Sequence, residues 1–87
     1  MSSASEIEQE NRHWLDRVGE LTGEPLDVEA VERVLELAKR VAHGADRPLA
    51  PVAAYALGVA VARGADADTT AHRIADLGGE ADLGAED

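Results

Sequence analysis

This chain of 87 residues has no cysteine, no long apolar run and no basic N-terminal segment. Without cysteine, the chain has no disulfides and no thiol nucleophile. It also has no thiolate ligands for an iron–sulfur cluster or a zinc ion. No basic stretch followed by an apolar one comes after Met1, so we expect no secretory signal. The longest apolar run, 49–62, has 14 residues and contains Pro51 and Gly58, whereas a membrane span needs about 20. We therefore expect a cytoplasmic protein with no membrane partner.

Basic residues are also scarce, because 8 lysines and arginines stand against 18 acidic residues, for a net charge of −10. This charge repels phosphate backbones and anionic lipids, so we expect no nucleic-acid partner. Seven of the acids lie in 1–10 and 80–87, which leaves 11 acidic against 8 basic residues, or −3, elsewhere. We predict a flexible N-terminus at 1–5, one helical domain at 6–78 and an acidic disordered tail at 79–87.

Apolar residues recur at the spacing of an α-helix in four segments, and no segment alternates as a strand does. The connections are short, which favours antiparallel neighbours. We therefore predict an all-α fold, a compact four-helix bundle that is mostly antiparallel. The first predicted helix spans 4–22 and is ended by Gly23, and the second begins at the N-cap Asp27 and ends at Gly44. The third spans 52–63, with Asp46 or Ala50 as its cap and Gly64 at its end. The fourth is short, is capped by Asp68 or Thr69 and is ended by Gly78 and Gly79.

The third predicted helix, 52–63, is apolar around its whole circumference. An all-round apolar helix is typical of the centre of a bundle, so we predict that it is nearly fully buried, with Tyr55 and Leu57 in the core. Small residues four apart on one face would let a neighbouring backbone approach closely. Gly44 is predicted to take a left-handed conformation at the end of the second helix.

Residues that would carry catalysis or bind metal are scattered along the chain. His13, His43 and His72 fall on three different predicted helices, and no His-x-x-x-His pair is present. The acids of the second helix stand four residues before arginines, which is typical of a solvated, ion-paired surface. The serines fall in the predicted N-terminal tail, where no base accompanies them. We therefore predict no catalytic residue, no metal site, no cofactor and no enzyme activity.

One segment concentrates positive charge on this acidic chain: Lys39, Arg40, His43 and Arg47, which we call the basic corner. These side chains could contact a carboxylate, a phosphate or an acidic stretch of a partner. Alternatively, they stabilise the end of the second helix, because cations are favourable near a helix C-terminus and Arg47 could bind the last carbonyls. Both interpretations stay open at this point.

Three stretches carry a resemblance: Trp14-Leu15-Asp16, Leu26-Asp27-Val28, and the sequence His-Gly-x-x-Arg-Pro-x-x-Pro at 43–51 followed by Gly58. Over residues 11–77 the chain resembles a small actinobacterial all-helical domain of unknown function. That domain is found alone or fused to molybdenum cofactor guanylyltransferases, which attach GMP to molybdopterin. The resemblance implies an association with molybdenum cofactor maturation. It does not imply transferase activity, because nucleotide binding in those enzymes belongs to a separate α/β domain.

The hypothesis that follows is a non-catalytic accessory or protein-interaction module, associated with the synthesis of molybdopterin guanine dinucleotide. Its partner would be a protein, with a molybdenum cofactor enzyme as the candidate, and the basic corner would be the contact. One alternative is a domain that binds a small anionic ligand, a nucleotide or a pterin, at the same corner. Another is a structural homodimer, formed through the small residues of 52–63 or through the side that carries Trp14.

Overall fold

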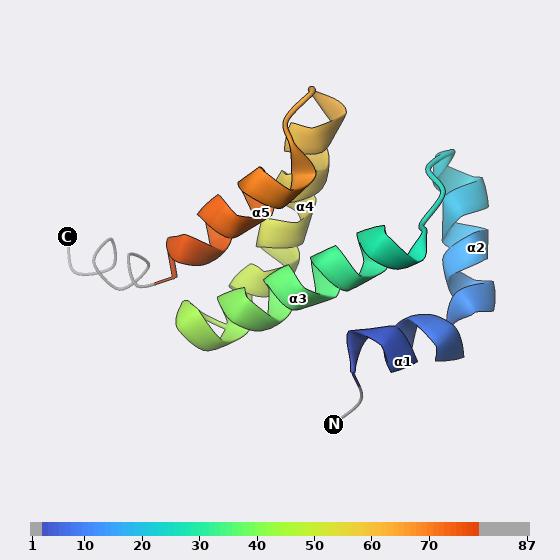
Figure 1. Ribbon diagram of the computed structural model, residues 1–87, viewed down its shortest axis with the longest axis horizontal. Helices are drawn as coiled ribbons and strands as arrows, with labels where there is room; N and C mark the ends of the chain where they lie inside the picture. The colour runs from blue at the N-terminus through green and yellow to red at the C-terminus, as the bar shows by residue number, and fades with distance from the viewer. Residues whose placement is uncertain (1–2, 79–87) are drawn as a thin grey trace. The chain divides into compact units, whose positions relative to one another are not determined.

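The computed structural model describes residues 3–78, and these residues form five α-helices and no strand (Figure 1). The all-helical fold class is therefore confirmed for the described part of the chain. The chain divides into two units, residues 1–35 and 36–87, and α3 (Val28–Gly44) runs from the first into the second. The predicted acidic tail at 79–87 lies outside the described residues, as do the first two residues of the predicted N-terminal segment.

In the first unit, α1 spans Ala4–Glu10 and begins at a side-chain cap. The hydroxyl of Ser3 accepts a hydrogen bond from the backbone N–H of Glu6 at 3.1 Å and donates one to Oε1 of Glu6 at 3.2 Å. The Ser-x-x-Glu spacing is that of a capping box, which satisfies free N–H groups at a helix start. Ser3 is therefore the cap of α1, and the first turn follows from Ala4.

The predicted continuous helix over 4–22 is wrong, because the chain breaks at Asn11 between α1 and α2 (Arg12–Thr22). Asn11 has φ −114° and ψ 19°, and its side-chain amide donates to the carbonyl of Ile7 at 2.8 Å. An asparagine side chain competes in this way for backbone carbonyls and interrupts a helix. This break is the reason that residues 3–78 contain five helices rather than the predicted four. The end of α2 is as expected, because Gly23 is left-handed with φ 74°.

The turn between α2 and α3 lies close against α2. A side chain at Gly19 would meet the carbonyl oxygen of Glu24 at 3.2 Å, so glycine allows this approach. After the turn, Asp27 Oδ1 accepts a hydrogen bond from the N–H of Ala30 at 2.8 Å. This bond confirms Asp27 as the N-cap of α3.

In the second unit, α4 (Leu49–Ala62) and α5 (Ala67–Asp76) pack with the C-terminal half of α3. The most deeply buried side chains are Leu37 and Leu57, each 2% exposed. The predicted cap of the last helix is wrong, because Asp66 Oδ2 accepts from the N–H of Thr69 at 2.9 Å and the helix starts at Ala67. The core of this unit consists of Leu37, Val41, Ala53, Leu57 and Ala71, with Ala45, Ile74 and Ala75 packed against it.

Gly44 lies at a close backbone contact with Gly78 and does not take a left-handed conformation. It is the last residue of α3, and among residues 3–78 only Gly23 and Gly64 have positive φ. A Cβ placed on Gly78, just after α5, would lie 3.2 Å from both the carbonyl carbon and the oxygen of Gly44. The prediction of a left-handed Gly44 is therefore wrong. It is the absence of a side chain at Gly78 that lets the ends of α3 and α5 meet so closely.

Candidate functional site

The most exposed apolar surface of the second unit lies on α4, which the sequence predicts to be nearly fully buried. That prediction is wrong: Leu57 is 2% exposed, but Tyr55 is 75% and Val52 58% exposed. The helix contains no charged residue, so its composition does not reveal which side faces the core. In the described part of this unit, the core covers the side with Ala53 and Leu57. We call the opposite side the exposed α4 face; it consists of Pro51, Val52, Tyr55, Gly58 and Ala62.

Beside this face the second unit has an apolar groove with a volume of about 440 Å³. Pockets that take small ligands have volumes of roughly 300–1,000 Å³, so the groove is large enough to accept an apolar side chain. Val52 belongs both to the groove and to the exposed α4 face. The other large residues that line the groove are Val41 from α3, Leu49 from α4, Ile74 from α5, and Leu77, which directly follows α5.

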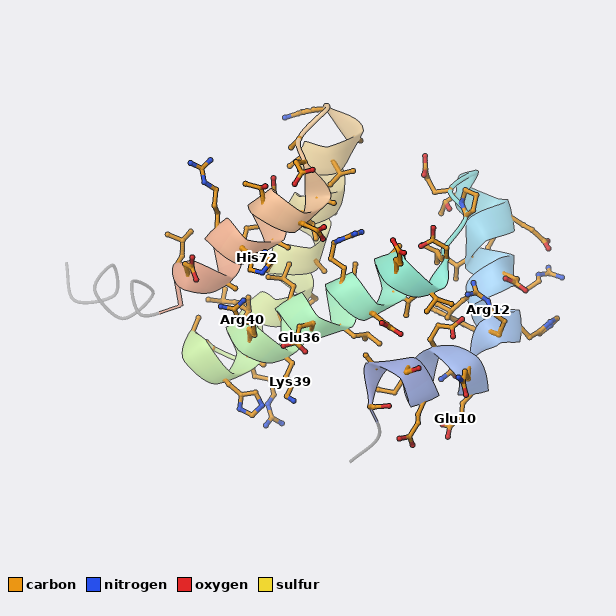
Figure 2. All side chains as sticks on the ribbon, in the orientation of Figure 1. Glu10, Arg12, Glu36, Lys39, Arg40 and His72 are labelled. Atoms are coloured by element: carbon orange, nitrogen blue, oxygen red, sulfur yellow. The ribbon has the colours of Figure 1, made fainter. Side chains whose placement is uncertain are left out.

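The basic corner is exposed, but helix geometry does not bring all four of its side chains together. Lys39 and His43 are four residues apart on one side of α3, and Arg47 lies in the turn before α4. Figure 2 shows Lys39 and Arg40 leaving α3 on different sides, with Arg40 directed toward α5. There Arg40 Nη2 lies 3.4 Å from Asp76 Oδ1. Arg40 thus has an ion-pair partner inside the unit, and none of the four residues lines the apolar groove.

A second polar cluster, which the sequence analysis missed, is centred on Arg12 in the first unit (Figure 2). Arg12 Nη1 donates to Glu8 Oε1 at 2.6 Å and Nε donates to Asp16 Oδ1 at 3.0 Å. Nη2 donates to the carbonyl oxygen of Leu26. The hydrogen bond with Glu8 is the main cause that raises the pKa of Arg12, and Asp16 adds to it. Through these three contacts the guanidinium joins α1, α2 and the turn before α3.

The Arg12 cluster borders an open hollow of about 620 Å³ on the first unit. Its lining includes Arg12, Asp16 and Glu20 from α2 and Asp27 from the turn. Each guanidinium nitrogen of Arg12 already has an acceptor within the unit. We therefore assign Arg12 to holding this unit together. The signal in the sequence was the spacing of Glu8, Arg12 and Asp16, each four residues from the next.

Potential metal ligands do not cluster in the part of the chain that the structure describes. No group of three or more histidine, aspartate or glutamate side chains is arranged there to hold a metal ion. His72 is engaged locally, since its Nδ1 lies 2.7 Å from the carbonyl oxygen of Asp68. None of the helices within residues 3–78 combines the length and apolar character that crossing a membrane requires.

The described residues thus define a small all-helical domain whose distinctive surface is an apolar helix face. The chain belongs to the family of the domain of unknown function DUF6457, whose model matches residues 6–85. This match contains α2 to α5 and most of α1, and it continues seven residues beyond Gly78. Neither a curated protein nor a solved structure matches the chain.

Proposed function

We propose that this protein is a non-catalytic accessory module that binds another protein through the exposed α4 face. The observation that carries the proposal is the exposure of Tyr55, 75%, on a helix without a charged residue. Contiguous exposed apolar surface is typical of protein-interaction sites, because leaving it in water costs free energy. Tyrosine is enriched at such sites, since its ring gives a large contact area and its hydroxyl can still find a partner.

The charges at the two ends of α4 indicate the chemistry of the partner. Arg47 stands two residues before the helix and Arg63 directly after it, and both are exposed. A partner that fits this face has an apolar strip with acidic side chains near its ends. Two copies of this chain fit less well, because parallel or antiparallel pairing of α4 sets arginine against arginine. Each copy also carries a net charge of −10, which opposes pairing.

A molybdenum cofactor guanylyltransferase is the partner that we propose to test first. The support for this choice is the resemblance of residues 11–77 to domains that occur alone or fused to such enzymes. A separate protein that resembles a fused domain is suited to bind the same enzyme without a covalent link. In this proposal the basic corner, through Lys39 and Arg47, contacts acidic residues beside the apolar strip.

Isothermal titration calorimetry with the purified guanylyltransferase of the same organism tests this proposal. We expect Tyr55→Glu to weaken binding by about tenfold or more, because it introduces a charge into the apolar contact. Leu21→Glu is the matched control, since Leu21 is 83% exposed on α2 and undergoes the same change in charge. Equal affinities for wild type and Tyr55→Glu would exclude α4 as the contact. Absence of any binding by the wild type would exclude this enzyme as the partner.

Light scattering of the isolated chain tests the homodimer alternative. The presence of Gly58 and Ala62 on the exposed α4 face favours this alternative, because small residues allow two helices to approach closely. The chain has a mass of 9.1 kDa, and we expect this monomer mass at all concentrations. A stable mass of twice this value, returned to the monomer by Tyr55→Glu, would assign the face to a second copy.

A further inference from the structure

We propose that the chain's own C-terminal segment, residues 79–87, binds the apolar groove of the second unit, with Leu83 as the anchoring side chain. The groove is lined by Val41, Leu49, Val52, Ile74 and Leu77. This proposal concerns a contact within one chain, and it does not depend on the identity of any external partner.

The last described residue lies at the groove itself. Gly78 lines the groove, and its backbone packs against Gly44 at the end of α3. Leu83 follows five residues later, and five residues of extended chain span at most roughly 17 Å. The segment therefore begins beside its proposed binding site and is long enough to turn back into it.

The side chains of the segment match the groove in polarity. Leu83 is the single large apolar residue in 79–87, where the others are glycine, alanine, aspartate and glutamate. The groove has an apolar lining, and its residues Leu49, Val52 and Leu77 are exposed in the absence of an occupant. One leucine entering the groove would remove apolar surface from water on both sides of the contact.

The charge of the segment also suits the surface from which it starts. Glu80 and Asp82 follow Gly78 closely, and Gly78 contacts Gly44, which lies between His43 and Arg47 of the basic corner. Acidic side chains near this corner are attracted to it, whereas elsewhere the chain is acidic and repels them. The family match extends to residue 85, so the matched part of the sequence includes Leu83.

Methyl-labelled NMR of the full chain tests this contact directly. We expect nuclear Overhauser effects from the methyl groups of Leu83 to those of Ile74, Leu77 or Val52. Leu83→Asn should abolish them and shift the methyl resonances of the groove residues. The matched control is Ala85→Asn, which adds the same polar group two residues later and should leave these resonances in place. Both substitutions lie outside the helices of residues 3–78, so the groove stays formed.

Two results would overturn the proposal. The first is the absence of nuclear Overhauser effects from the Leu83 methyl groups to the groove, together with equal shifts of the groove methyl resonances in Leu83→Asn and Ala85→Asn. The second is a nuclear Overhauser effect between two chains in a sample that mixes differently labelled chains, because it would show that a second copy occupies the groove. Neither result bears on binding through Tyr55, which is measured by calorimetry, so the two proposals fail independently.

Discussion

Glu8 accepts a hydrogen bond from Nη1 of Arg12 at 2.6 Å, and this carboxylate is buried, with only 4% of the residue exposed. The pair joins α1 to α2 across the break at Asn11. Because Arg12 also donates to the carbonyl of Leu26, it connects both helices to the turn before α3. In the described part of the first unit, Val31 is the one buried apolar residue, so this polar cluster has a large share in holding the unit together.

Removing the buried carboxylate should therefore destabilise the first unit. We expect Glu8→Ala to lower the free energy of unfolding, because it removes the buried acceptor of the 2.6 Å hydrogen bond from Nη1 of Arg12. Glu10→Ala, at an exposed position on the same helix, should change it by less than about 0.5 kcal/mol. Urea unfolding followed by the fluorescence of Trp14 measures both. Equal effects of the two substitutions would show that the cluster is not structural.

Two glycines should respond to alanine in opposite directions. Gly58 lies inside α4 with open space where a Cβ would stand, so Gly58→Ala should stabilise the protein by about 0.5–1 kcal/mol. Gly78→Ala should destabilise it by about 1–3 kcal/mol, because the new Cβ would lie 3.2 Å from backbone atoms of Gly44. Chemical denaturation gives both values. A stabilising Gly78→Ala would contradict the close contact between the ends of α3 and α5.

Substitutions on the two sides of α4 should differ strongly in their cost. Leu57→Ala should lower the free energy of unfolding by about 2–5 kcal/mol, because it leaves a cavity among Leu37, Ala53 and Ala71. Tyr55→Ala, two residues earlier on the same helix, should change it by less than about 0.5 kcal/mol. Denaturant titrations of the isolated chain measure both. Similar large losses would mean that α4 is buried on both sides, as its composition alone predicts.

Local signals in the sequence were sufficient for the helical class and for several helix ends. Asp27 acts as an N-cap and Gly23 and Gly64 are left-handed, because each effect depends on the residue's own chemistry and nearest neighbours. Asn11 was missed because an asparagine inside an amphipathic pattern does not reveal whether its amide will take a backbone carbonyl. Asp66 was missed because Asp68, two residues later, is an equally good cap by type.

Features that depend on distant residues could not be obtained from the pattern. The sequence of an apolar helix does not show which of its sides its own chain covers, so the exposure of Tyr55 was not predicted. The need for glycine at position 78 follows from the backbone of Gly44, which is 34 residues earlier in the chain. All four residues of the basic corner are exposed. That Lys39 lies on one side of α3 and Arg40 on another, beside Asp76, depends on how α3 and α5 are oriented, which the sequence pattern does not give.

The central claim is that another protein covers the exposed α4 face, and photo-crosslinking in cells of the native organism tests it most directly. A photoreactive phenylalanine at position 55 reports what touches this face, and the same group at position 21 is the control, because both side chains are exposed. We predict one discrete adduct at position 55 that is absent at position 21. The protein identified in this adduct should bind the purified Tyr55→Glu variant with an affinity about tenfold or more lower than that for the wild type. No adduct at position 55, or the same adducts at both positions, would contradict the claim.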